Sequence, residues 1–360
     1  MIADDLLFTY RKYPLMRAQD FVKMLYQGEY GGAHGNNDDL AAADSLKKEI
    51  KSMKPVSFKE ELVEDISANF ARVNLRPFVA SGKNVETLRE MFVKSRAKSA
   101  SRERLDRKLE IFTEQCCVRK IDLPYLTVKK FVNEYKAADY PVESHSMTYR
   151  LNYFPAYRRV VRRDFFGLFD IIDSINSLLK AQTNLIVAID GMSGSGKTYT
   201  AEKLKEYFDC NIIHTDDFFL PSNMRTPERL SKIGGNIHFE RLAPLLKSIK
   251  KGDAPVFDRY DCKTDSFEKA EMPPKRLTIV EGCYSLHQSL INCYDGAALF
   301  KVNGDVQLKR ILDRSGAEML KRYREEWIPM ENRYFEAVNL AQLPVKVVDT
   351  SDRKILKTDF

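Results

Sequence analysis

The first half of the chain carries apolar residues at intervals of three and four, which is the spacing of an amphipathic helix. The pattern is clearest over residues 18–30 and 85–115. Two turn-rich stretches, 31–38 and 74–84, interrupt it. We therefore expect a mainly helical N-terminal domain of unknown role over 1–163, followed by a second domain over 164–360 that opens with a helix at 164–182.

The second half alternates short apolar runs rich in β-branched residues with helical patterns. This alternation predicts a parallel sheet covered by helices on both faces, an α/β fold. The expected strands are 185–190, 211–215, 277–282, 297–302 and 345–350, and the expected helices are 197–208, 306–316 and 330–341.

The sequence GMSGSGKT, residues 191–198, fits the phosphate-binding pattern G-x-x-x-x-G-K-[ST] at every fixed position. A strand is predicted before it and a helix after it, as this loop requires. The glycines let successive backbone N–H groups point at phosphates, and the helix adds its positive N-terminal end. We expect Lys197 to reach the phosphates of ATP and the Thr198 hydroxyl to contact Mg²⁺. The predicted ATP contacts are Gly191, Ser193, Gly194, Ser195, Gly196, Lys197, Thr198 and Tyr199.

Acidic residues follow two of the other predicted strands. Glu281 ends the strand in LTIVEG, where a carboxylate can organise Mg²⁺ directly or through water. Asp216 and Asp217 follow the run NIIHT. Two adjacent acids cannot both face one point, so we expect one to face the acceptor as a general base and the other to turn away. A strand-terminal surface acid and a turn-capping pair are the structural alternatives.

An arginine-rich helix follows the predicted strand at 297–302. Arg310 and Arg314 are four residues apart and share a face, so they are candidates to stabilise charge on the transferring phosphoryl group. Arg322 is a candidate for ATP binding. An exposed charged helix is the alternative interpretation.

Together these residues resemble the uridine kinase and phosphoribulokinase branch of P-loop kinases over about residues 183–350. The resemblance implies that Asp216 is the catalytic base and Glu281 a magnesium-shell acid. It also implies a lid that carries Arg310, Arg314, Arg322 and Arg324. The substrate-binding residues that it suggests are Asp217, Phe219, Asn236, His238, Arg259 and Tyr260.

Three positions depart from the uridine kinase pattern. His238 stands where that branch has a ribose-binding aspartate, and Arg259 and Cys262 align with its aromatic residue and histidine. The leading expectation is an ATP- and Mg²⁺-dependent small-molecule kinase that phosphorylates a hydroxyl of a nucleoside or related metabolite. An anionic sugar or vitamin precursor remains an alternative acceptor. An NTP hydrolase, or an ATP-binding regulator with the N-terminal half as effector, remains an alternative function.

Polar residues also gather in turn-rich parts of the first half, namely His34, Arg72, Arg76, His145 and Arg150. They are either satisfied structural residues or a second site for an anionic ligand.

The composition of the chain limits the kinds of binding partner that we expect. The net charge is +7, and acidic residues interrupt the first of two basic runs, 94–108 and 157–165, so a small-molecule acceptor is expected rather than nucleic acid. No run approaches the roughly 18 apolar residues of a membrane helix, and the six cysteines form no C-x-x-C pair. We expect a cytoplasmic protein without a membrane partner, and homo-oligomerisation is left open.

Overall fold

The computed structural model describes residues 2–32, 39–53, 60–97, 99–154, 157–338 and 345–352, without the side chains of 39–43. The chain divides into two compact units, with the division between Gly167 and Leu168. The boundary expected from the sequence lies four residues earlier. No helix among the described residues is both long enough and apolar enough to cross a membrane.

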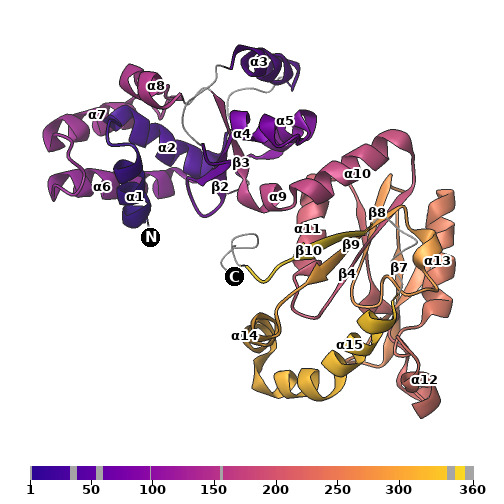
Figure 1. Ribbon diagram of the computed structural model, residues 1–360. Helices are drawn as coiled ribbons and strands as arrows, with labels where there is room; N and C mark the ends of the chain where they lie inside the picture. The colour runs from indigo at the N-terminus through magenta and orange to yellow at the C-terminus, as the bar shows by residue number, and fades with distance from the viewer. Residues whose placement is uncertain are drawn as a thin grey trace. The chain divides into compact units, whose positions relative to one another are not determined.

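The N-terminal unit is mainly helical, as predicted (Figure 1). Its core forms where α2 and α7 pack on α6, with α1 also contacting α6. The rings of Phe21 and Phe112 stack there with their centres 4.8 Å apart. The helices are α1 (Ile2–Lys12), α2 (Ala18–Tyr30), α3 (Asp39–Ser52), α4 (Leu75–Ala80), α5 (Val85–Lys94), α6 (Arg102–Cys117), α7 (Tyr125–Ala137), α8 (Met147–Tyr153) and α9 (Arg163–Gly167).

A small antiparallel sheet also belongs to this unit, and the sequence pattern did not predict it. Its order is β1 (Val63–Asp65), β2 (Phe70–Asn74), β3 (Arg158–Arg162). Every residue of the central strand β2 is buried, including Arg72 and Asn74. Because these polar residues interrupt the apolar residues of β2, the sequence does not show the apolar run that is typical of a buried strand. The stretch 74–84, expected as turns, contains helix α4.

The C-terminal unit is built on a five-stranded parallel sheet in the order β10-β9-β4-β8-β5. Its central strands are apolar runs buried on both faces, as is typical of parallel sheets. The bounds are β4 (Leu185–Gly191), β5 (Asn211–His214), β8 (Leu277–Glu281), β9 (Gly296–Lys301) and β10 (Val345–Asp349).

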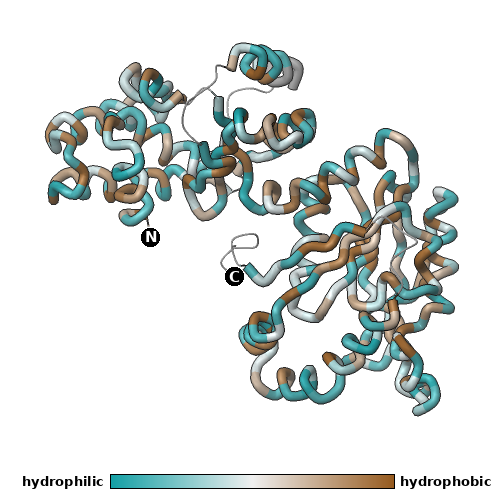
Figure 2. The backbone as a smooth tube through the Cα atoms, in the orientation of Figure 1, coloured by the Kyte–Doolittle hydropathy of each residue, from teal (hydrophilic) through white to brown (hydrophobic). Residues whose placement is uncertain are grey.

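Helices cover both faces of this sheet. Helix α13 (Phe239–Lys251) packs its leucines on the face that carries Ile186 and Ala188. Helices α10 (Phe169–Ala181) and α11 (Lys197–Tyr207) lie on the opposite face in Figure 1. Figure 2 shows hydrophobic residues concentrated along the strands between these layers. The predicted α/β fold is therefore confirmed.

Several elements differ from the expectation. The helix predicted over 164–182 is two helices, α9 and α10, on either side of Leu168. An antiparallel hairpin, β6 (Val256–Asp261) and β7 (Ser266–Glu271), stands outside the main sheet and contacts the segment after β5. Helix α14 (Gly304–Arg322) continues through a π-helical turn, Tyr323–Trp327, into α15 (Ile328–Ala337).

Candidate active site at the carboxyl edge of the sheet

The phosphate loop, residues 191–198, joins the end of β4 to the start of α11, as its pattern requires. Gly191, Gly194 and Gly196 have φ values of 150°, 72° and 90°, a region that side chains disfavour. A Cβ atom on Gly191 would lie 2.2 Å from the carbonyl oxygen of Phe300 on the neighbouring strand. The loop therefore needs glycine both for its backbone conformation and for its close approach to β9.

Lys197 lies across this loop. Its Nζ donates hydrogen bonds to the carbonyl oxygens of Gly191 at 2.8 Å and Met192 at 3.0 Å. The side chain is largely buried. The ammonium group is thus held over the loop, where bound phosphates could draw its hydrogen bonds away from these carbonyls.

Thr198 and Glu281 meet at the carboxyl edge of the sheet. The Thr198 hydroxyl donates to Glu281 Oε1 at 3.0 Å, and His214 Nδ1 lies 2.6 Å from the same oxygen. This contact raises the pKa of His214. Glu281 Oε2 is buried and has no hydrogen-bond partner within the described part of the chain. A buried carboxylate oxygen without a donor, beside a hydroxyl, suits a hard cation such as Mg²⁺.

Magnesium commonly takes one or two protein carboxylates and completes its shell with phosphates and water. The pair Thr198 and Glu281 fits that mode. Over the described ranges, no group of three or more His, Cys, Asp and Glu side chains is arranged to hold a metal. The residues present therefore fit an ion that is carried in with nucleotide phosphates.

The segment after β5 carries the acidic pair in a short 3-10 helix, Thr215–Phe218. Asp216 is reached by solvent, yet surrounding protein and the Glu281 carboxylate raise its pKa, while Lys197 acts in the opposite direction. Desolvation also raises the pKa of Asp217, which His214 and Arg259 oppose. Asp216 thus shares the field of the phosphate loop, and Asp217 also feels the hairpin that carries Arg259.

Close packing of two strand ends brings these acids together. Gly282, which follows β8, has φ 136°, and a Cβ atom there would lie 1.9 Å from Thr215 Oγ1. The Thr215 hydroxyl also donates to the carbonyl oxygen of Cys283 at 3.1 Å. A side chain at 282 would push the end of β5, and Asp216 with it, away from Glu281.

Two buried acids of this site were missed from the sequence. Asp190, the residue before Gly191, accepts hydrogen bonds from the N–H groups of Gly191 at 2.6 Å and Leu286 at 2.8 Å and from the Tyr334 hydroxyl at 2.5 Å. Burial raises the pKa of Asp190 to about 6. Its position at a strand end directly before the loop was an available signal.

Glu331 on α15 is the second of them. It accepts a hydrogen bond from the Ser193 N–H at 2.9 Å and another from the Ser193 hydroxyl. Its side chain is buried. No local pattern could have revealed this role, because Glu331 is far from the loop in sequence and sits in an ordinary helical repeat.

The four candidate lid arginines lie in different settings, and Arg324 is exposed in the π-helical turn. Arg310 donates to the carbonyl oxygens of Gly194 at 3.1 Å and Thr350 at 2.6 Å, which joins the loop to the end of β10. Arg314 donates to the Tyr323 hydroxyl at 2.9 Å. Arg322 lies over the ring of Trp327 and 3.4 Å from Glu326.

Tyr323 connects Arg314 to the site. The negative charges of Asp216 and Glu331 both contribute to the raised pKa of Tyr323, after desolvation, whereas Arg314 lowers it. Arg314 is therefore held next to a tyrosine in the field of both acids. The contacts of Arg310 instead support the shape of the loop and the sheet edge.

The predicted acceptor residues are brought beside the acidic pair by a short antiparallel contact. Phe219 bridges to Ile237, the Leu220 N–H donates to the Asn236 carbonyl at 2.9 Å, and the His238 N–H donates to the Phe218 carbonyl at 2.7 Å. Asn236 Oδ1 is buried and, within the described ranges, accepts no hydrogen bond.

The other predicted acceptor residues have partners of their own. His238 Nδ1 lies 3.1 Å from Glu240 at the start of α13. Arg259 pairs loosely with Glu268 across the hairpin at 3.5 Å, and both side chains are exposed. The Tyr260 hydroxyl donates to Asp265 at 2.6 Å and accepts from Arg225 at 3.3 Å.

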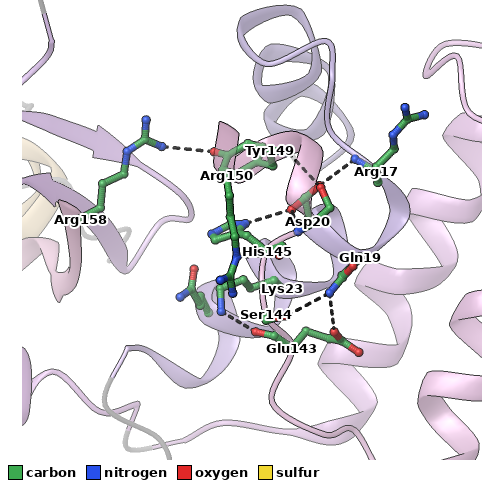
Figure 3. A network of polar contacts seen from close by, with 12 residues as sticks. Arg17, Gln19, Asp20, Lys23, Glu143, Ser144, His145, Tyr149, Arg150 and Arg158 are labelled. Carbon is green, nitrogen blue, oxygen red and sulfur yellow. Dashed lines mark hydrogen bonds and ion pairs between the residues drawn. The ribbon is translucent and has the colours of Figure 1, made fainter. Parts of the chain in front are cut away.

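The remaining candidates belong to the N-terminal unit. His34 lies outside the described residues. Arg76 is paired with Glu60 at 3.2 Å and lies over the ring of Tyr157. His145 and Arg150 belong to a polar network in which His145 Nδ1 lies 3.1 Å from Asp20 (Figure 3). Arg72 donates to the Gln27 side chain at 3.3 Å.

Comparison with known proteins gives three curated relatives, while no protein-family model matches the chain. Uridine-cytidine kinase C of Dictyostelium discoideum is 25% identical over 194 residues, 50% of this chain and 43% of that protein. Inorganic pyrophosphatase TTM2 of Arabidopsis thaliana is 26% identical over 202 residues, 51% of this chain and 28% of that protein. Uridine kinase of Chlamydia pneumoniae is 25% identical over 169 residues, 42% of this chain and 76% of that protein.

The predicted resemblance to uridine kinases is thereby confirmed over about half of the chain. The chain spans less than half the length of the first two of these relatives. Their names also differ in chemistry, one a kinase and one a pyrophosphatase.

Proposed function

We propose that the C-terminal unit is a nucleotide-dependent phosphotransferase that moves the γ-phosphoryl group of ATP to a hydroxyl of a small molecule. The observation that carries the proposal is the hydrogen bond of 3.0 Å between Thr198 and Glu281 at the carboxyl edge of the sheet. Asp216, which follows β5 at the same edge, lies in the electrostatic field of Lys197. A bare nucleotide-binding site has no need of a second acid on the acceptor side. Phosphoryl transfer does, because the attacking hydroxyl must be positioned and must lose its proton.

The chain's own groups divide the work as follows. The N–H groups of the phosphate loop and the ammonium of Lys197 bind the phosphates. Thr198 and Glu281 would hold Mg²⁺, which when bound offsets the charge on the phosphate oxygens. Asp216 accepts the proton of the acceptor hydroxyl, and its raised pKa makes this carboxylate a stronger base than an ordinary aspartate. Arg314, held by Tyr323, is the candidate to close over the transferring group.

The leading acceptor is a nucleoside, because two of the relatives are named as uridine kinases. An anionic acceptor is favoured by one specific observation. Arg259 acts electrostatically on Asp217, next to the proposed base, and its loose contact with Glu268 leaves the guanidinium exposed. Such a group can fork onto a carboxylate or phosphate, which uridine does not offer.

The experiment is to measure ADP formation from ATP and Mg²⁺ with water alone, uridine, cytidine, and a panel of sugar acids and phosphorylated alcohols. Wild type, Lys197→Ala and Arg259→Ala are compared. We expect acceptor-dependent turnover in wild type and none in Lys197→Ala, because the variant leaves the phosphate charge unneutralised. Loss of one anionic acceptor in Arg259→Ala, with uridine unaffected, would identify an anionic substrate.

Other outcomes would refute the kinase proposal. Rapid phosphate release from ATP without any acceptor would indicate a hydrolase. ATP binding without turnover on the whole panel would favour a regulator. Normal turnover by a folded Lys197→Ala protein would remove the phosphate loop from the chemistry altogether.

A further inference from the structure

Four basic side chains converge within the N-terminal unit. Lys23 comes from α2, Arg72 from β2 and Arg150 from α8, and His145 lies in the segment that leads into α8. We refer to these four residues as the basic cluster. Desolvation lowers the pKa of Lys23, and the charges of Arg72 and Arg150 lower it further, while Glu143 and Asp20 act in the opposite direction. Desolvation also lowers the pKa of His145, and Arg72 adds to that effect.

Arg72 is the buried end of the cluster. The side chain is 2% exposed, yet its NH2 donates a single long hydrogen bond, 3.3 Å, to the Gln27 side chain. Its NH1 has no hydrogen-bond partner among the described residues. Glu64, its cross-strand neighbour on β1, lies 3.8 Å away. Five donors fixed in a buried guanidinium are costly to leave unpaired, so Arg72 has spare capacity for an anion.

Lys23 and Arg150 form the accessible end. Lys23 Nζ donates to the carbonyl oxygen of Glu143 at 2.5 Å, and Arg150 Nε donates to that of His145 at 3.0 Å. In Figure 3 the two cationic groups lie next to each other beside the His145 ring. Neither forms an ion pair with a carboxylate in the described part of the chain. Two positive charges that lie close together repel each other, and an anion between or beside them relieves this repulsion.

The nearby carboxylates form their hydrogen bonds with other residues. Asp20 is fully buried and accepts hydrogen bonds from the N–H groups of Arg17 and Ser146 and from the Ser146 hydroxyl. It also contacts His145. The Glu143 carboxylate is turned to Gln19, at 3.2 Å. Glu64 accepts a hydrogen bond from the Tyr13 hydroxyl at 2.5 Å and also lies 3.9 Å from Arg158. The charges of Glu143 and Asp20 still act on Lys23, but neither carboxylate forms an ion pair with Lys23 or Arg150 among the described residues.

We propose that the basic cluster binds the phosphate group of a small phosphorylated molecule. Lys23 and Arg150 would bind its outer oxygens, and Arg72 would supply the buried donor behind them. A phosphate monoester carries about −1.5 to −2 at neutral pH, which matches two unpaired cations better than the single charge of a carboxylate. Burial lowers the pKa of His145 to about 4, so its ring is neutral at pH 7 and adds no further charge. The basic cluster is built from residues of the N-terminal unit, whereas the residues of the proposed kinase site belong to the C-terminal unit.

The test is hydrogen–deuterium exchange on the full chain with inorganic phosphate, which reports where an anion binds. Potassium chloride and potassium acetate at matched ionic strength are the comparison salts. We expect phosphate to slow exchange in peptides that cover 19–27 and 143–153, separately from any effect at the phosphate loop 191–198. In Lys23→Gln and in Arg150→Gln, the phosphate concentration needed for this protection should rise about tenfold or more, as for loss of a hydrogen bond to a charged group.

Arg107→Gln is the matched control, because Arg107 is exposed in the same unit and its Nε likewise donates to a backbone carbonyl, that of Glu103. It should leave phosphate protection unchanged. Protection confined to 191–198, equal protection by chloride, or equal weakening by Arg107→Gln would overturn the proposal. Equal protection by acetate would overturn the preference for phosphate and indicate a carboxylate site. None of these results depends on kinase turnover.

Discussion

The Glu331 carboxylate accepts hydrogen bonds from both the backbone N–H and the hydroxyl of Ser193, within the phosphate loop. A negatively charged group thus occupies donors in a segment whose geometry suits phosphate. Glu331 is carried by α15 and is buried. A nucleotide that enters the loop therefore meets an anion that either moves away or repels it.

From this relationship we predict that Glu331→Gln binds ATP with Mg²⁺ about tenfold more tightly than wild type. Removing one charge-assisted hydrogen bond from the competing group, and its repulsion of phosphate, accounts for this magnitude. Titration calorimetry measures it, with Glu336→Gln on the exposed face of the same helix as the control. Weaker ATP binding in Glu331→Gln would show that the carboxylate instead holds the loop in its binding conformation.

The acidic pair gives a second prediction. Asp216→Asn should keep ATP binding and lower kcat by about 10²–10⁴, the usual contribution of a positioned general base. Asp217→Asn should cost much less, because Asp216, and not Asp217, has its pKa affected by Lys197. The measurement is steady-state turnover with the acceptor that the panel of compounds identifies, together with ATP titration of each variant. A larger loss in Asp217→Asn would reverse the assignment of the two roles.

Much of the C-terminal unit was predictable because its strands are apolar runs and its loop has a fixed pattern. The expected strands at 211–215 and 277–282 are β5 and β8, and they deliver Asp216 and Glu281 to one edge. The carboxyl ends of parallel strands share one edge of a sheet, so local sequence predicts the common edge, whereas the pairing of β5 with β8 is seen only in the structure.

The remainder depends on tertiary contacts that no local pattern encodes. Glu331 reaches Ser193 across 138 residues. The strand β2 does not look like an apolar run in the sequence, because it contains Arg72 and Asn74. The burial of these residues depends on partners in other elements. The hairpin β6–β7 has a mostly exposed, charged pattern that does not resemble a core strand.

A third prediction concerns pH. The hydrogen bond to Glu281 raises the pKa of His214, so the folded state holds this proton more tightly than the unfolded chain. The resulting stabilisation is fully present below the unfolded pKa of about 6.5 and is lost as pH rises through the higher folded pKa. The difference in unfolding free energy between wild type and His214→Gln should therefore be larger at about pH 6 than at about pH 9.

Urea unfolding at the two pH values measures this difference. His238→Gln is the control of opposite sign, because desolvation lowers the pKa of His238. Its folded state holds the proton less tightly, so the wild-type advantage over His238→Gln should shrink as pH falls. Parallel behaviour of the two variants would mean that His214 is not charged by its contact with Glu281.

The last prediction tests whether the C-terminal unit folds by itself. One core cluster lies among residues Ile186 to Tyr334 of this unit and another among Leu6 to Val160 of the N-terminal unit, and these two clusters share no residue. A fragment 165–360 keeps α10, whose buried residues include Phe169, Ile172 and Ile175. We expect this fragment to melt cooperatively and to bind ATP.

A second fragment, 183–360, removes α10 and isolates its contribution. Four apolar residues of α10 are buried, and burial of such side chains contributes about 1.5–3 kcal/mol each. The loss of roughly 6–12 kcal/mol is comparable to the whole stability of a typical domain, about 5–15 kcal/mol. The shorter fragment should therefore fail to melt cooperatively in calorimetry and should bind no ATP. If the longer fragment also aggregates, the two units depend on each other for folding; if the shorter one folds normally, α10 is not part of the core.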